Sequence, residues 1–152
     1  MPAISFSGEP RRGPFWRLIL DGEKTMTTRK VRKRGGPRVG QTAYLYWKQR
    51  VAKTDKPIHH IGDSTIISVK RYPNMRRLLL ALGVKGSLEY IKAEGFDNLG
   101  ELVEWWTGVE SPTYGITEEG ILLGYEVMNL LEQSGPVEVI EWAYPLMEEA
   151  EP

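Results

Sequence analysis

Alternation of apolar and polar residues, together with β-branched and aromatic stretches, predicts five short strands in this chain. The first, Ala3 to Ser7, places every second side chain on an apolar face, and so does the last, Val137 to Tyr144. The strand between Thr42 and Lys48 is rich in aromatic and β-branched residues, which favour a half-buried sheet. The predicted strands cover residues 3–7, 24–29, 42–48, 64–72 and 137–144.

Between these strands, apolar residues three and four positions apart predict helices, and caps mark their ends. Phe15, Leu18 and Ile19 form one apolar face after Pro14, and Gly22 ends that helix. Further helices are predicted at 74–82, 87–94, 98–106 and 117–132, with starts at Asn74, Ser87, Asn98 and Thr117 and with Gly83 and Gly95 as stops. Strands, then helices, then a returning strand indicate an α+β fold. With no repeat or long linker, residues 1–152 are predicted to form one domain.

The distribution of charge is uneven, although the net charge is zero. Residues 1–56 hold 14 of the 20 basic side chains and only four acidic ones, and the acidic excess lies in the second half. This division favours a surface that faces a polyanion. The alternative is that the fold mixes the two halves and cancels the field.

The most informative segment is Gly22-Glu23-Lys24-Thr25-Met26-Thr27-Thr28-Arg29, just after the first predicted helix. Two cations, Lys24 and Arg29, flank hydroxyl groups there. Such donors directed at one point would hold a phosphate, a carboxylate or a polarised carbonyl. The alternative is a solvated turn that leads into an edge strand.

A basic run follows at once, with Arg32, Lys33 and Arg34 before two glycines, a proline and Arg38. Clustered cations on a loop are suited to contacts with a phosphate backbone, and together with Lys24, Thr27 and Arg29 they are the predicted ligand-binding residues. A merely solvated loop is the alternative. Aromatic residues of the strand at 42–48 would stack on bases if exposed, or fill the core if buried.

Several classes of protein are excluded or disfavoured. Cysteine is absent, so disulfides, thiolate nucleophiles and Cys-based zinc sites are excluded. His59 and His60 are adjacent and lack a metal-binding spacing, and no phosphate-loop or dinucleotide motif occurs, so we expect neither a metal nor a cofactor. No apolar run approaches the ~20 residues of a membrane span. The expectation is a cytoplasmic protein without membrane contact and with no particular oligomeric state predicted.

The pattern G-x-K-x-x-T-x-R, here Gly22, Lys24, Thr27 and Arg29, resembles the signature of the ASCH family (activating signal cointegrator homology domains). The sequence around Ala93-Glu94-Gly95-Phe96 and Leu99 to Leu102 resembles the family's helical segment. The flanking strands also fit. The matches run from residue 3 to about 107 and resume at about 137, and the helix predicted at 117–132 is extra.

The resemblance implies a PUA-like, partly open β-barrel flanked by helices, with an extra helix near 117–132. It implies RNA or a nucleoside-like ligand as the partner, bound in a positively charged cleft at the signature. Some small bacterial members hydrolyse the N4-acetyl group of acetylated cytidine, and their active residues correspond to Lys24, Thr27 and Glu94 here. Without the resemblance, Glu94 beside Gly95 would be expected to point into water at a helix end.

Three hypotheses follow. The first is an ASCH domain that binds RNA or a modified nucleoside. The alternative is an amidohydrolase for N4-acetylcytidine-like nucleosides, with Lys24, Thr27 and Glu94 as its catalytic residues. This alternative requires the Glu94 carboxylate within hydrogen-bond reach of Lys24 or Thr27. The third is a protein-interaction adaptor that uses an exposed apolar stripe on the 117–132 helix.

Overall fold

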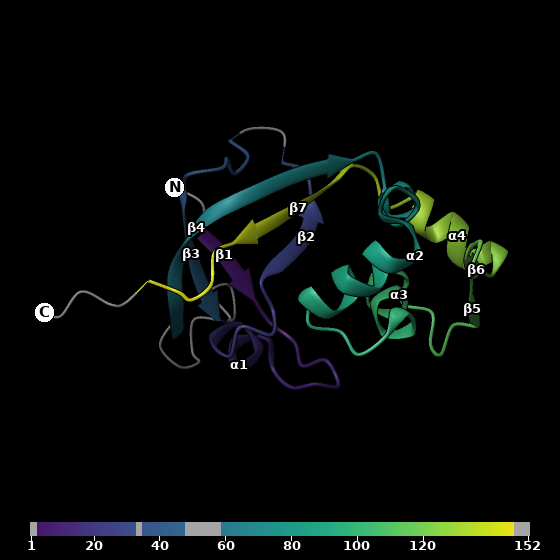
Figure 1. Cartoon of the computed structure of the whole chain (residues 1–152), viewed down its shortest axis with the longest axis horizontal. Helices are drawn as coiled ribbons and strands as arrows, with labels where there is room; N and C mark the ends of the chain where they lie inside the picture. Colours follow the sequence, from purple (N-terminus) through teal and green to yellow (C-terminus); the bar gives the residue numbers. More distant parts are fainter. Residues whose placement is uncertain (1–2, 33–34, 48–58, 148–152) are drawn as a thin grey trace, which may run out of the picture.

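The computed structural model describes residues 3–32, 35–47 and 59–147, and within them the chain forms an α+β fold. Five strands make one sheet in the order β1-β3-β4-β7-β2, and this sheet curls into a half-barrel (Figure 1). Only β1 and β3 pair in parallel, and the other neighbours are antiparallel. The sheet strands are β1 (Ala3–Phe6), β2 (Met26–Lys30), β3 (Thr42–Trp47), β4 (His59–Tyr72) and β7 (Val137–Trp142).

The helices flank the half-barrel, and a second small sheet lies beyond them. In Figure 1, α2 and α3 stand beside β2, and α4 lies with β5 and β6 at the end away from the sheet. The helices are α1 (Phe15–Leu20), α2 (Met75–Ala93), α3 (Leu99–Thr107) and α4 (Tyr125–Glu132), and the hairpin is β5 (Tyr114–Thr117) with β6 (Gly120–Leu123). A partly open barrel flanked by helices is compatible with this arrangement.

The core joins the half-barrel to α1 and to the segment after α2. Phe6 of β1 packs edge-on against Phe15 of α1 and Trp142 of β7, with ring centres 6.4 and 5.8 Å apart. Phe15 also packs against Phe96, which follows α2. Since Trp142 is 1% exposed and lies at the end of β7, this aromatic cluster packs β7 against β1 and α1 in the core.

Local caps confirm most of the predicted helix boundaries. The Asn74 side chain accepts a hydrogen bond from the backbone N–H of Arg77 at 2.8 Å, which starts α2. Gly83, predicted as a stop, has φ 71° and ψ −175°, which an α-helix cannot contain, and the resulting kink divides α2 into two helical halves at the predicted place. Beyond the kink, the Ser87 hydroxyl donates to the Leu79 carbonyl at 3.1 Å, so it satisfies the end of the first half instead of starting a new helix.

The helix predicted at 117–132 is wrong in its first half. Residues 114–123 form the β5–β6 hairpin, and α4 begins only at Tyr125. The Thr117 hydroxyl, predicted to cap a helix, closes the hairpin turn by hydrogen bonds of 3.1 and 3.2 Å with the Gly120 carbonyl and N–H. Gly120 has φ 158°, a backbone conformation that a helix cannot contain. The strand predicted at 64–72 is also longer than expected, since β4 begins at His59.

Candidate functional site

Lys24 lies in the turn that connects α1 to β2. Gly22 takes φ 77° after the helix, and the backbone N–H groups of Glu23 and Lys24 then both donate to the Leu18 carbonyl, at 2.9 and 3.0 Å. This tight turn directs the Lys24 side chain inward, where it is 2% exposed. The signature lysine is therefore a buried cation, not a surface one.

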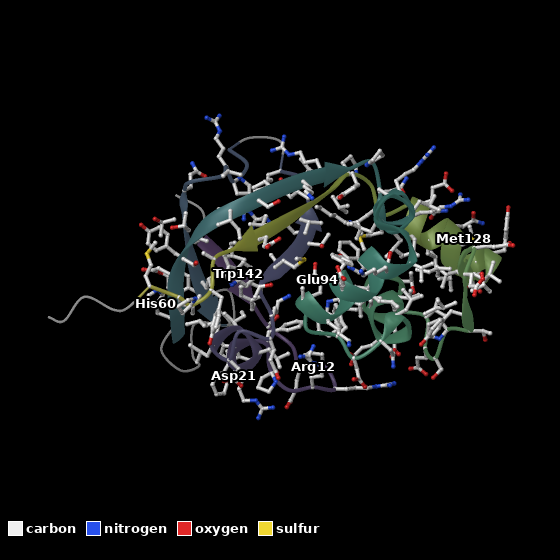
Figure 2. All side chains as sticks on the ribbon, viewed as in Figure 1. Arg12, Asp21, His60, Glu94, Met128 and Trp142 are labelled. Carbon is white, nitrogen blue, oxygen red and sulfur yellow. The ribbon has the colours of Figure 1, made fainter. Side chains whose placement is uncertain are left out.

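Glu94 is the C-cap residue that follows α2 and is also buried, at 4% exposure. The expectation from the local sequence alone, that it points into water, is wrong. Gly95 follows with φ 99°, and a Cβ there would come within 3.2 Å of Leu18. The absence of a side chain at Gly95 lets the end of α2 approach α1 and the turn, and Figure 2 shows Glu94 where α2 faces the half-barrel.

The Lys24 ammonium uses all three of its donors inside the protein. It donates to the carbonyls of Met26 and Glu94 at 2.7 and 2.6 Å, and to Glu94 Oε2 at 3.1 Å. The Phe15 ring lies 4.7 Å away and adds a cation–π contact. Burial lowers the pKa of Lys24 below its ordinary value of 10.5, and the charge and hydrogen bond of Glu94 act in the opposite direction.

The second oxygen of the Glu94 carboxylate binds a hydroxyl. Thr28 Oγ1 of β2 donates to Glu94 Oε1, and Tyr90 Oη of α2 lies 2.6 Å from the same Thr28 oxygen. Because Thr28 has one proton and gives it to the carboxylate, Tyr90 must be the donor in the second bond. Desolvation, followed by the Glu94 charge, raises the pKa of Tyr90 well above its ordinary value.

This network adjoins a cleft of about 360 Å³ between α2 and the β2–β7–β4 part of the sheet. Tyr90 is part of both, so the hydrogen-bonded chain ends at the cleft wall. The charged residues that line the cleft are Lys70, Glu89 and Glu141, so carboxylates outnumber cations there. The remaining lining includes Thr25, Met26, Ser68, Tyr72, Leu82, Gly86, Ala93 and Val139.

Thr27 and Arg29 lie on the other face of β2. Side chains alternate along a strand, so Thr27 and Arg29 share a face that Thr28 does not. Arg29 is opposite Glu138 of β7 and contacts its carboxylate at 3.5 Å, and Arg71 of β4 contacts the other oxygen at 3.4 Å. The structure therefore brings Lys24 and Glu94 together and places Thr27 and Arg29 outside their network.

The predicted basic loop is described only in part. Arg32 and Arg38 are exposed, whereas the predicted ligand-binding residues Lys33 and Arg34 lie outside the described residues.

Thr28 and Tyr90 are the site residues that sequence reasoning missed. Tyr90 precedes Glu94 by four positions on a predicted helix, and this spacing, which puts two residues on one face, was a usable signal. For Thr28 the signal was weaker, because it is one of two adjacent threonines. The position at which the strand leaves the preceding turn decides which threonine faces the interior, and the sequence does not give that position.

Over the ranges 3–32, 35–47 and 59–147, no three His, Asp or Glu side chains are grouped as metal ligands. Within the same ranges, none of the helices has the length and apolarity that crossing a membrane requires. No protein-family model matches the chain, and no match is found among curated proteins or solved structures.

Proposed function

We propose that this protein hydrolyses the acyl group of an N-acylated nucleoside, with N4-acetylcytidine as the type of substrate, in the cleft beside Tyr90. The observation that carries the proposal is the Thr28–Glu94–Lys24 arrangement. A hydroxyl hydrogen-bonded to a base, which is in turn oriented by a third group, is the arrangement that activates a nucleophile. The resemblance to ASCH domains points independently to Lys24 and Glu94.

In the proposed reaction, Glu94 takes the Thr28 proton as the hydroxyl oxygen attacks the acyl carbonyl carbon. The Tyr90 hydroxyl, which donates to the Thr28 oxygen, is placed to donate to the oxyanion that forms beside it. Collapse of the intermediate breaks the C–N bond, and Glu94 returns the proton to the leaving amine. Water then releases the acid from the threonine ester by the same route in reverse.

Lys24 acts in this scheme through Glu94. Its donors are all used by Glu94 and two carbonyls, so it fixes the carboxylate with one oxygen toward Thr28. The charges of the cleft support an uncharged nucleoside as the ligand, since two carboxylates, Glu89 and Glu141, and one cation, Lys70, line it.

The test is incubation of purified protein with N4-acetylcytidine and chromatographic measurement of cytidine. We expect release by the unmodified protein and a loss of about 10²–10⁴-fold in Glu94→Gln, because the amide cannot accept the Thr28 proton. Glu126→Gln, an exposed change on α4, is the control and should retain full activity. Absence of cytidine from the unmodified protein, or full activity in Glu94→Gln, would contradict the proposal.

The second candidate function is binding of RNA, and the observation that favours it is the exposure of Lys30 and Arg32 at the end of β2 and of Arg38 ahead of β3. Affinity for labelled single-stranded RNA should then fall steeply with salt. Replacing Arg32 and Arg38 by alanine should reduce the slope of log K against log salt by about one per lost phosphate contact. An unchanged slope would remove these arginines from the interface.

A further inference from the structure

A second hollow lies at the other end of α2, away from Lys24 and Glu94. It is a groove of about 290 Å³ between the first half of α2, the turn of the β5–β6 hairpin and α4. Most of its wall is apolar, with Leu79, Leu80, Val84, Ile121, Leu123 and Met128 among the lining residues. No step of the proposed hydrolysis uses it.

The kink of α2 lies at the wall of the groove, because Gly83 is one of its lining residues. The backbone there takes φ 71°, and a Cβ at Gly83 would meet nothing within 4 Å, so the kink opens onto free space. Leu80, one turn before the kink, is 65% exposed at the groove wall. An exposed leucine is ordinary by itself, but one that borders an apolar groove marks an interaction surface.

The predicted adaptor surface, an apolar stripe on the 117–132 helix, is not the exposed feature. The stripe residues Val127 and Leu131 of α4 are buried against the rest of the fold. In this region the described residues instead form an apolar groove, which α4 lines together with the hairpin and α2.

All charged residues in the segment that builds one side of the groove are acidic. Residues 108–135 contain five glutamates and no lysine or arginine. Two of them, Glu118 and Glu119, are exposed at the hairpin turn and line the groove. The cation on the opposite side, Arg76, is paired with Glu132 at 3.0 Å and so adds little positive field.

We propose that this groove docks a basic, amphipathic helical segment of a partner protein. Apolar side chains of that segment would lie along Leu80, Val84 and Ile121, and its lysines or arginines would face Glu118 and Glu119. Two glutamates along one side of an apolar groove favour this chemistry, because they repel acidic helices and leave neutral ones without charge pairing.

A second copy of this chain fits the groove less well. Its basic segment, residues 29–38, carries the charge but contains two glycines and a proline and has no apolar residues at helical spacing. A foreign basic helix supplies both features at once.

The test uses a labelled synthetic peptide made only of leucine and lysine in an amphipathic helical pattern, with a leucine–glutamate peptide of the same pattern for comparison. Fluorescence anisotropy should show saturable binding of the lysine peptide to the full chain and none of the glutamate peptide. Leu80→Ser and the double variant Glu118→Lys/Glu119→Lys should each weaken binding by about tenfold or more. Leu80 is exposed, so its replacement leaves the fold and the cytidine-releasing site intact.

A charge-matched control, Glu9→Lys/Asp21→Lys, reverses two exposed acids outside the groove. If it weakens binding as much as the groove variant, the attraction is general and the proposal fails. Equal binding of both peptides would show an apolar surface without charge selection, which also overturns it. Sedimentation of the chain alone that reveals dimers lost in Glu118→Lys/Glu119→Lys would replace the foreign partner by a second copy.

Discussion

The ammonium of Lys24 and the carboxylate of Glu94 lie 3.1 Å apart in the protein interior, although 70 positions separate the two residues. Their side chains are only 2% and 5% exposed. Both groups are desolvated, and a buried charge without its counter-charge would strongly destabilise the fold. The pair therefore links the α1–β2 turn to the end of α2 and, through Thr28, positions the carboxylate at the proposed site.

Removal of both partners should destabilise the fold by less than the sum of the two single removals. Glu94→Leu leaves a buried ammonium without its counter-charge, and we expect a loss of about 3–5 kcal/mol in the free energy of unfolding. In Lys24→Met/Glu94→Leu no charge remains buried, so the loss should be smaller than the sum of the two single losses. Urea unfolding of the unmodified protein, Lys24→Met, Glu94→Leu and the double variant at neutral pH gives the coupling energy between Lys24 and Glu94. Additive losses would show that the two groups do not interact.

Thr28, and not Thr27, should supply the hydroxyl used in hydrolysis. Thr28→Val removes the group bonded to Glu94 while keeping the shape, so cytidine release should fall by about 10²–10⁴-fold. Thr28→Ser should retain part of the activity. Thr27→Val, on the other face of β2, is the matched variant and should remain active. The opposite ranking would support the assignment of Thr27 that the family resemblance implies.

The parts of the fold that depend on local chemistry could be predicted from the sequence. Asn74 caps α2, because its side chain can accept a hydrogen bond from a free backbone N–H at the helix start. Gly22 and Gly95 take positive φ where helices end, because glycine adopts this conformation without steric cost. Alternation likewise located the sheet strands to within a few residues.

The parts of the fold that depend on distant contacts could not be predicted from the sequence. Glu94 beside Gly95 is locally a surface residue, and only the approach of the α1–β2 turn buries it. The choice between Thr27 and Thr28 depends on how that irregular turn enters β2, which alternation within the strand does not reveal. In residues 114–123 the apolar spacing suits a helix as well as a hairpin, and the turn at Gly120 decides between them.

Arg29 should contribute more to stability than Arg71. Both contact the fully buried Glu138, but the Arg29 side chain is 21% exposed and that of Arg71 is 57% exposed. A bond to a buried charge is worth about 1.5–3 kcal/mol, and exposure to solvent reduces this. Urea midpoints should therefore fall further in Arg29→Ala than in Arg71→Ala. Equal midpoints would contradict this ranking, because the less exposed contact with Glu138 would then be worth no more than the exposed one.

Tyr90 should make the protein sensitive to alkaline pH. Its pKa in the fold is raised well above 10.0, so above pH 10 the unfolded chain loses this proton while the folded chain retains it. The folded state then binds more protons than the unfolded state, and the free energy of unfolding falls with rising pH by up to about 1.4 kcal/mol per pH unit. In Tyr90→Phe this contribution is absent.

The variant starts about 1 kcal/mol less stable at neutral pH, through loss of the bond to Thr28, and the difference should shrink and then reverse above pH 10. Urea unfolding between pH 8 and pH 11 checks the crossing, with Tyr125→Phe, 83% exposed, as the control that should run parallel to the unmodified protein. Parallel curves for Tyr90→Phe would mean that the Tyr90 hydroxyl ionises in the folded protein as readily as in the unfolded chain, and that Tyr90 is not the buried donor to Thr28.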